Sequence, residues 1–512
     1  MKKSIKKTFK KSISLLKKPK FAIPFVIVLV TGLYGGYRIQ KHYHFLGDGV
    51  THINWADMDS FMETARSDDK RMPKFHQESL LANVPSSKTY DSKTGKMVPV
   101  AVWDSWPVQN PDGTVADFHG YRLVLGLTSK NARNDGEAKI GIYAQKISDN
   151  SNDISTWKYL GDAFNTPYEG APNGKPDKYL SKKYGEWSGS TVMMNSKDSS
   201  IRLFYANAML DDAGQALTTA EITLDPQNGS DWNSGLVINH DKAKDHKTVF
   251  TGDGEYYQIP SQNPGHAAKA SEELTMRDPH FVQDGDQYYL IFEGNTGSKY
   301  NIQGERNFTN YSNYGDWNTY RYMKNKFAMN KDSISYGKAY YANAAIGKIQ
   351  LNKDFSVKKV MKPMVVANMV DDEIERVNLF QFQGKWYLFA TSWGAKFAST
   401  DKNYENKVFM MGYVSENGIN GDYKKLNGNG MVMISNTGGP DFTYAHLVIP
   451  NKDQKNDKMV VTSFEDSHTF APSFLMQLKG RETHIITDRV LDQGALVDNG
   501  KYYDAEPQVL NN

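Results

Sequence analysis

Short runs of β-branched and aromatic residues recur along the chain from Tyr121 onward, each separated from the next by a cluster of turn-forming residues. Such runs are typical of β-strands, whereas helical periodicity occurs near Asp57–Ser67 and is sparse elsewhere. Many short strands with few helices predict an all-β fold, which could be a sandwich, a barrel or a propeller. The expected strands are Tyr121–Leu127, Ala138–Ile147, Ile201–Ala208, Ala216–Leu224, Tyr288–Phe292, Ala344–Leu351, Trp386–Thr391, Val408–Val414 and Met459–Phe464.

A weak internal repeat narrows this choice. Asp104, Asp278 and Glu375 are each followed by a turn that contains glycine and then by an aromatic-rich strand. Repeated units that each offer one carboxylate to a shared centre favour a β-propeller, in which the innermost strands surround an axial cavity. An ordinary recurrence of strand, turn and strand would give a similar pattern.

The amino terminus has the charge pattern of an export segment. Residues 1–20 hold nine lysines and no acidic residue, and the apolar run Phe21–Tyr37 follows them. The positive flank predicts a basic region left in the cytoplasm and export of everything after the run. With about 17 residues the run is between a signal-peptide core and a full span, and no good small-x-small cleavage site follows. An uncleaved membrane anchor is therefore favoured over a cleaved signal peptide.

We thus expect an extracellular protein that is secreted or anchored to the cell membrane. A polar linker is expected over residues 38–54, one folded domain over residues 55–505, and a short tail over residues 506–512. The nine lysines of residues 1–20 carry more positive charge than the net +3 of the whole chain, so the rest of the chain is mildly acidic. It has no basic stripe, and nucleic acid is therefore not an expected partner. The absence of cysteine excludes disulfides, thiolate nucleophiles and cysteine-based metal sites.

Three short acidic motifs lie far apart in the chain, each among aromatic or apolar residues. They are Val102–Pro107, Arg277–His280 and Asp372–Arg376. Cleavage of a glycosidic bond with retention requires a carboxylate nucleophile and a carboxylic acid about 5 Å apart. The three motifs can supply that pair and one further carboxylate.

The first two motifs also have ordinary structural interpretations. Asp104 is followed by Ser105 and Pro107, which predicts that its strand ends nearby and presents the carboxylate from a turn, where it could simply be a cap. Arg277 beside Asp278 could be a surface ion pair.

The third motif carries more information because its meaning depends on the backbone. On an extended strand Glu373 and Glu375 would face the same way, and two neighbouring carboxylates raise each other's proton affinity, as a general acid requires. On a solvated helix, Glu373 would instead pair with Arg376. The apolar residues on both sides favour a buried strand.

Taken in this order, the three motifs resemble those of the levansucrases and inulosucrases, the fructosyltransferases of glycoside hydrolase family sixty-eight. The resemblance extends from about Trp55 to Leu496. It implies a five-bladed β-propeller with the active site in a deep axial pocket. Further matching segments are Gly185-Glu186-Trp187-Ser188-Gly189-Ser190, Phe292-Glu293-Gly294-Asn295-Thr296-Gly297, Phe442-Thr443-Tyr444-Ala445-His446 and Phe470-Ala471-Pro472-Ser473-Phe474.

The resemblance implies roles for individual residues. Asp104 matches the nucleophile, Asp278 the transition-state stabiliser and Glu375 the general acid/base. Trp393 departs from the family pattern, because it stands near the sucrose and acceptor subsites where Arg or His is expected. The other matches to substrate-binding positions are Trp103, Trp187, Ser188, Arg277, Glu373 and Tyr444, with Glu293 as a supporting carboxylate.

Many relatives from Gram-positive bacteria also hold a structural calcium ion. The matching ligand positions are Gln303, Asn343, Asp372, the Tyr341 carbonyl and Glu272, where Asp is usual. Calcium accepts a shell of about six to eight oxygens, so the longer carboxylate remains compatible with it. The alternative is a group of polar loop residues with no ion.

The implied activity is transfer of fructose from sucrose to a growing fructan or to water by a monomeric enzyme without an organic cofactor, with levan favoured as the product. Inulosucrase and an invertase-type hydrolase are the alternatives within enzymes, although invertases carry Glu-Cys where this chain has Glu375-Arg376. A non-catalytic glycan-binding propeller is the alternative from another class. Sucrose, fructan acceptors and, through the amino-terminal segment, the bacterial membrane are the expected partners.

Overall fold

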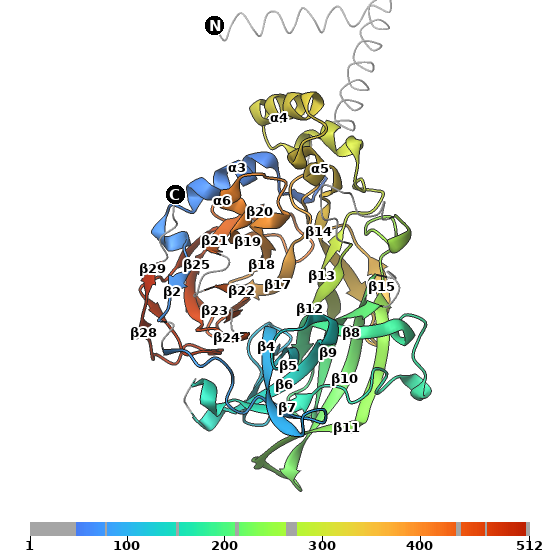
Figure 1. The fold of residues 1–512 in the computed structure, drawn as a ribbon, viewed down its shortest axis with the longest axis vertical. Helices are drawn as coiled ribbons and strands as arrows, with labels where there is room; N and C mark the ends of the chain where they lie inside the picture. The colour runs from blue at the N-terminus through green and yellow to red at the C-terminus, as the bar shows by residue number, and fades with distance from the viewer. Residues whose placement is uncertain are drawn as a thin grey trace, which may run out of the picture.

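The computed structural model describes residues 48–76, 79–149, 153–209, 214–262, 274–436, 442–465 and 468–507. The fold is predominantly β, as expected, and each of the nine strands predicted from the sequence is present (Figure 1). The predicted basic region and the apolar run Phe21–Tyr37 lie outside the described residues. Within the described part of the chain, no helix is long and apolar enough to cross a membrane.

Most strands form antiparallel sheets of neighbours in sequence. The first, nine-stranded sheet joins two such groups through a parallel pair between β4 and β8. Its strands are β3 (Lys88–Asp91), β4 (Lys96–Gln109), β5 (Tyr121–Lys130), β6 (Lys139–Lys146), β7 (Lys158–Asp162), β8 (Lys183–Val192), β9 (Ser200–Met209), β10 (Gln215–Asn228) and β11 (Asp231–Phe250).

Three further sheets complete the body. One contains β1 (Thr51–His52), β12 (Met276–Asp284), β13 (Gln287–Asn295), β14 (Ala344–Leu351), β15 (Val357–Val360) and β16 (Val365–Val366). The next contains β17 (Glu375–Phe382), β18 (Lys385–Trp393), β19 (Lys407–Ser415), β20 (Lys424–Lys425) and β21 (Met431–Asn436). The last contains β22 (Thr443–Ile449), β23 (Lys458–Glu465), β24 (Thr469–Phe470), β25 (Phe474–Lys479) and β26 (Glu482–Ile485).

Five strands, here called the ring strands, close into a circle. They are β4, β8, β12, β17 and β22, and each contacts the next, while β22 contacts β4. Large apolar side chains fill the space between the sheets, and Leu203, Leu290 and Leu388 are fully buried there. A continuous packed core of this kind fixes the ring strands relative to one another.

The boundaries expected at the two ends of the domain need correction. Thr51–His52 pairs in parallel with Val365–Val366, so the carboxyl-terminal part of the predicted linker belongs to the folded body. At the other end, β29 (Glu506–Pro507) pairs with β2 (Pro73–Lys74), although the tail was expected to begin at residue 506. Two residues can complete a sheet edge without any hydrophobic pattern, because main-chain hydrogen bonds hold them. A second short pair joins β27 (Arg489–Val490) to β28 (Tyr503–Asp504).

The helices are more numerous than the sequence suggested. The helix expected near Asp57–Ser67 is present as α3 (Trp55–Thr64), and Asn54 and Asp57 form a capping box at its amino-terminal end. The prediction that helices are sparse elsewhere missed α4 (Trp317–Met329) and α5 (Ile334–Tyr341), which lie near α3 (Figure 1), and the single-turn α6 (Lys402–Glu405). In α4, exposed side chains of both polar and apolar kinds obscure the buried stripe of Tyr320, Met323 and Phe327.

Candidate active site

Every ring strand has a break in its pairing at the point where a predicted site residue lies. An extra residue on one strand forms a bulge, which bends the strand and redirects side chains. The shifts fall between Trp103 and Trp106 in β4, Trp187 and Gly189 in β8, Arg277 and His280 in β12, Glu375 and Asn378 in β17, and Tyr444 and Leu447 in β22.

The bulges place residues other than glycine in the left-handed region of backbone space. Asp104 (φ 44°), Asp278 (φ 53°), Arg376 (φ 55°) and Ala445 (φ 57°) lie at equivalent points of four ring strands. Such conformations are unfavourable for residues with a Cβ and cluster at functional sites. Asp104 was expected at the end of a strand, which is wrong, because β4 continues through the bulge to Gln109.

Asp278 is held by two hydrogen bonds from neighbouring ring strands. The Ser188 hydroxyl donates to one carboxylate oxygen at 2.5 Å, and the Arg376 main-chain N–H donates to the other at 2.7 Å. The side chain is 3% exposed. Both oxygens are therefore fixed in position before any ligand arrives, and the interpretation of Asp278 as half of a surface ion pair is excluded.

Arg277 connects three glutamates. Its guanidinium contacts Glu293 at 2.9 Å, Glu373 at 2.9 Å and Glu375 at 3.0 Å, and it lies over the Trp187 ring at 5.4 Å. The side chain of Arg277 is 4% exposed, so these pairs are little screened by water. One planar cation thereby fixes the positions of three carboxylates.

Neither backbone interpretation of the third motif is fully correct. β17 begins at Glu375, so Glu373 lies before the strand rather than on it. Both glutamates nevertheless face Arg277, and Lys396 contacts Glu373 at 2.8 Å. The helical alternative is wrong, because Arg376 turns away and donates to the Ser105 carbonyl at 3.1 Å.

Glu375 accepts from two aromatic side chains on its other oxygen. The Tyr444 hydroxyl donates a short hydrogen bond, and Trp393 Nε1 donates at 3.1 Å. Burial and then the charge of Glu375 raise the pKa of Tyr444 well above its ordinary value, so the hydroxyl stays protonated as a donor. Trp393 and Tyr444 lie against each other with ring centroids 4.1 Å apart.

Like Glu375, Asp104 is partly exposed. Burial raises its pKa from 3.8 to about 7, Arg376 opposes that shift, and the charges of Glu375 and Asp278 add to it. Trp103 beside it is buried at 1% exposure. The mutual influence of the three carboxylates places them at one centre, as the sequence predicted.

Three residues near this centre escaped the sequence analysis. Arg133, on the loop after β5, lies 5.8 Å from the Trp103 ring, and the charges of Asp104 and Glu375 contribute to raising its pKa. Phe442 lies 5.5 Å from the Trp393 ring. Lys396 reaches Glu373 from the segment after β18. Arg133 and Lys396 stand in no motif, and Phe442 belongs to a matching segment but had no predicted role.

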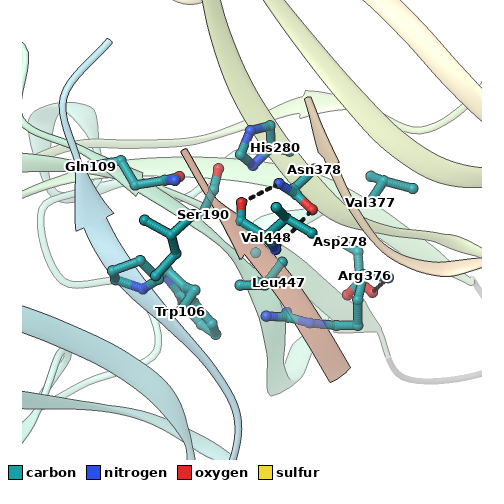
Figure 2. Close-up of a pocket in the computed structure, with 13 residues that line it drawn as sticks. Trp106, Gln109, Ser190, Asp278, His280, Arg376, Val377, Asn378, Leu447 and Val448 are labelled. Atoms are coloured by element: carbon teal, nitrogen blue, oxygen red, sulfur yellow. Dashed lines mark hydrogen bonds between the residues drawn. The ribbon is translucent and has the colours of Figure 1, made fainter. Parts of the chain in front are cut away.

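Beyond the site residues, the ring strands pack together and leave little space between them. A cavity of about 10 Å³ lies beside Asp278 and is surrounded by residues that follow the bulges, among them Trp106, His280 and Asn378 (Figure 2). Asn378 Nδ2 donates to the Val448 carbonyl at 2.8 Å across two ring strands. A cavity of this size holds about one water molecule and is too small for a sugar ring.

The predicted calcium ligands come together at a separate place. Gln303 Nε2 donates to Asn343 Oδ1 at 3.1 Å, and Ala344 N donates to the Asp371 carbonyl at 3.1 Å, which places the main chain of Asp372 beside that of Asn343. Glu272 lies outside the described residues. Among the residues that are described, no cluster of three or more His, Cys, Asp or Glu side chains could hold a metal.

A ring of β-strands that presents a partly exposed aspartate, a fixed aspartate and a glutamate between proton donors is the site of an enzyme that cleaves glycosidic bonds. The family described as Levansucrase/Invertase matches residues 54–497. The chain belongs to this family.

Individual relatives match over nearly the whole chain. The levansucrase of Bacillus amyloliquefaciens is 39% identical, and the inactive levansucrase of Geobacillus stearothermophilus is 35% identical; each match covers 88% of this chain and 91% of the relative. A crystal structure of a Bacillus megaterium levansucrase mutant is 37% identical and superposes with a TM-score of 0.79, covering 87% of this chain and 97% of the other.

Proposed function

We propose that this protein is a levansucrase-type fructosyltransferase that cleaves sucrose and transfers the fructosyl unit to a growing levan chain or to water. The observation that carries the proposal is the convergence of Asp104, Asp278 and Glu375 at the bulges of the ring strands, with Arg277 and Tyr444 bound to Glu375. Residues with this arrangement can perform both halves of a retaining displacement.

In the first step, Asp104 attacks the anomeric carbon of the fructosyl unit, and the bond to the glucose oxygen breaks. Glu375 gives its proton to that oxygen, so glucose leaves as a neutral sugar. Asp278, held by Ser188 and Arg376, stabilises the positive charge that develops on the fructosyl ring. The product of this step is a covalent ester between Asp104 and fructose.

In the second step, Glu375 removes a proton from the incoming hydroxyl, which attacks the same carbon and releases Asp104. The hydroxyl belongs to a fructan chain or to water. Trp393 and Phe442 lie beside Glu375 and form an aromatic surface on which an acceptor sugar can stack.

Separate assays of free glucose and free fructose, with the full chain, sucrose and calcium present, test the proposal. Glucose well in excess of fructose establishes transfer, and linkage analysis of the product then distinguishes levan from inulin. Equal amounts would make the protein a hydrolase. Release of neither sugar would favour a binding protein. Asp104→Asn is the matched control for background hydrolysis.

We further propose that the fold is a five-bladed propeller. The closed ring of β4, β8, β12, β17 and β22 supports this count, since each ring strand begins one group of antiparallel neighbours. A crystal structure with blades counted directly would test it.

A calcium ion is proposed at Gln303, Asn343, Asp372 and the Tyr341 carbonyl. A carboxylate, two side-chain amides and a main-chain carbonyl supply only oxygen ligands, which calcium prefers. Asn343 is fully buried and Asp372 is 5% exposed, so the charge of that carboxylate is little screened by water. The ion would hold the loop around Gln303 to the segment before β17, away from the reacting atoms.

Finally, we propose that the protein is exported and held at the outer face of the bacterial membrane by Phe21–Tyr37, and that it acts as a monomer. The lysine-rich flank and the length of the apolar run support the anchor. Detection of the intact amino terminus in the membrane fraction would support it, whereas a mature protein that begins after Tyr37 would contradict it. Light scattering tests the monomer.

A further inference from the structure

The outer face of α4 exposes an unusual set of large apolar side chains. Trp317 is 55% exposed, Tyr322 67%, Met329 82% and, at the start of α5, Ile334 58%. Solvent-exposed apolar side chains that gather over one helix mark a surface that binds something.

The same face is basic. Arg321, Lys324 and Lys326 are all exposed, and α4 contains no acidic residue. The acidic groups nearby already have partners: Asp316 caps the helix, Glu305 pairs with Lys331 at 2.6 Å, and Asp59 faces Lys326. The exposed Asp332, which lies between Met329 and Ile334 in sequence, also makes an interaction. The face therefore presents positive charge together with aromatic and aliphatic side chains.

This face is not required to hold the helix in place. The opposite stripe of α4, formed by Tyr320, Met323 and Phe327, is buried in the body, and Phe327 packs edge to face on Trp55 at 5.6 Å. The helix is thus fixed by one side, and the other side is available for a partner.

The position of α4 relates it to the amino-terminal segment. The Ala56 N–H donates to the Tyr314 carbonyl at 3.2 Å, so the start of α3 lies against the residues that precede α4 (Figure 1). The described chain begins at residue 48, close in sequence to this contact. The ten residues 38–47 span at most about 35 Å when fully extended. A body anchored through Phe21–Tyr37 thus keeps α4 close to the bilayer.

We propose that the outer face of α4, with Ile334, docks on the surface of a membrane that contains anionic lipids. Trp and Tyr side chains favour the boundary between head groups and acyl chains, and lysines close to a bilayer are attracted to anionic head groups. The docking rests on the proposed anchor for its geometry, and it would orient the body relative to the membrane.

Two other occupants fit the surface less well. A neutral fructan could stack on Trp317 but would gain nothing from Arg321, Lys324 and Lys326. A second copy of the chain would place two basic faces together, which like-charge repulsion opposes. The combination of cations with Met329 and Ile334 matches the chemistry of an anionic lipid surface.

Because the chain has no cysteine, a single introduced thiol can report on this face without ambiguity. Full-length Asn325→Cys, with the exposed α4 position labelled by a polarity-sensitive fluorophore, is mixed with vesicles of phosphatidylcholine alone or with added phosphatidylglycerol. The vesicles carry a lipid-attached nitroxide quencher. Ser230→Cys, at the exposed tip of the β10–β11 hairpin, is the remote control.

The expected result is a blue shift and quenching at position 325 with phosphatidylglycerol, and neither effect at position 230. Lys324→Glu with Lys326→Glu should abolish the effect, while Lys93→Glu with Lys96→Glu, which changes the net charge equally at the exposed β3–β4 turn, should leave it intact. Glucose release should be unchanged in both double variants. A label at 325 that stays in water on both kinds of vesicle would overturn the docking face.

Flotation with phosphatidylcholine vesicles in a sucrose-free density gradient separates the two proposals. If the chain floats there while position 325 stays in water, with or without phosphatidylglycerol, the anchor is supported and the docking face is refuted. Flotation that requires phosphatidylglycerol, together with quenching at 325, keeps the docking face and refutes the anchor. A chain that floats with neither vesicle overturns both.

Discussion

Asp104 is both the proposed nucleophile and a carboxylate whose surroundings oppose its charge. Burial raises its pKa from 3.8 to about 7. Only the ionised form can attack, so activity should fall as the pH falls through this value. We expect the acidic limb of kcat/KM, which reports the free enzyme, to lie near pH 7. An acidic limb near pH 4 would contradict this description of the site.

The same shift makes a prediction for stability. In the unfolded chain Asp104 ionises near 3.8 and in the folded protein near 7, so the folded state loses stability as the pH rises through that interval. Asp104→Asn removes this loss. The melting temperature of this variant should exceed that of the wild type at pH 8 and match it at pH 3. An equal or lower value at pH 8 would show that the ionised Asp104 does not destabilise the folded protein.

Trp393 is the residue that sets this site apart from the pattern expected of the family. Its indole N–H donates to Glu375 at 3.1 Å without bringing a charge. Trp393→Phe keeps an aromatic ring and removes this donor, so glucose release should fall by a few fold, as expected for the loss of one hydrogen bond of about 1 kcal/mol. Initial rates on sucrose test this prediction, and an unchanged rate would refute the role of this contact.

At the residue scale, the sequence predicted the three carboxylates but not all of the side chains that surround them. Asp278 and Glu375 could be predicted because each stands in a motif of its own. The approach of Arg133 to Asp104 could not, because no sequence motif shows how the loop after β5 lies against β4.

At the scale of elements, the bulges turn ordinary strands into a site. On β8 the bulge contains Gly189, where an added Cβ would lie 1.9 Å from the Phe204 carbonyl oxygen. Gly189→Ala should therefore lower the unfolding free energy by about 1–3 kcal/mol and reduce glucose release, because Ser188 would shift away from Asp278.

Gly185→Ala on the same strand is the matched control, since its Cβ would meet nothing closer than 3.7 Å. Chemical denaturation and initial rates of both variants test the comparison. Equal stability of the two variants would show that the bulge does not need its glycine. The expected change for Gly185→Ala is within about 0.5 kcal/mol.

The strands themselves were predictable and the bulges were not. Alternation of apolar and aromatic residues marks a strand such as Trp386–Thr391 whatever its neighbours are. The left-handed conformations at Asp104 and Arg376 have no such mark, because these residue types do not ordinarily adopt them and the neighbouring strands impose them. Helix α4 was missed because only three of its residues are buried.

At the scale of the molecule, the proposed calcium ion would join two segments far apart in sequence. A ligand that binds only the folded state raises stability, by about 2.7 kcal/mol at a concentration one hundred times its Kd. Calcium should therefore raise the melting temperature of the wild type, and chelator should lower it. Asp372→Asn should remove the response, with magnesium as the ionic control. A wild type indifferent to both calcium and chelator would exclude the ion.

The general architecture followed from the sequence, while its closure and its boundaries did not. The order of the motifs predicted that three distant carboxylates share one centre. That β22 returns to β4, and that Thr51–His52 joins the edge strand β16, depends on main-chain pairing between segments without a shared pattern.

The covalent bond between Asp104 and fructose is tested most directly by mass spectrometry after rapid acid quenching of the enzyme with sucrose. We expect one added fructosyl unit on the peptide that contains Asp104, and no such adduct in Asp104→Asn. An adduct on the peptide of Asp278 or Glu375, or glucose release with no adduct on any peptide at every quench time, would contradict it.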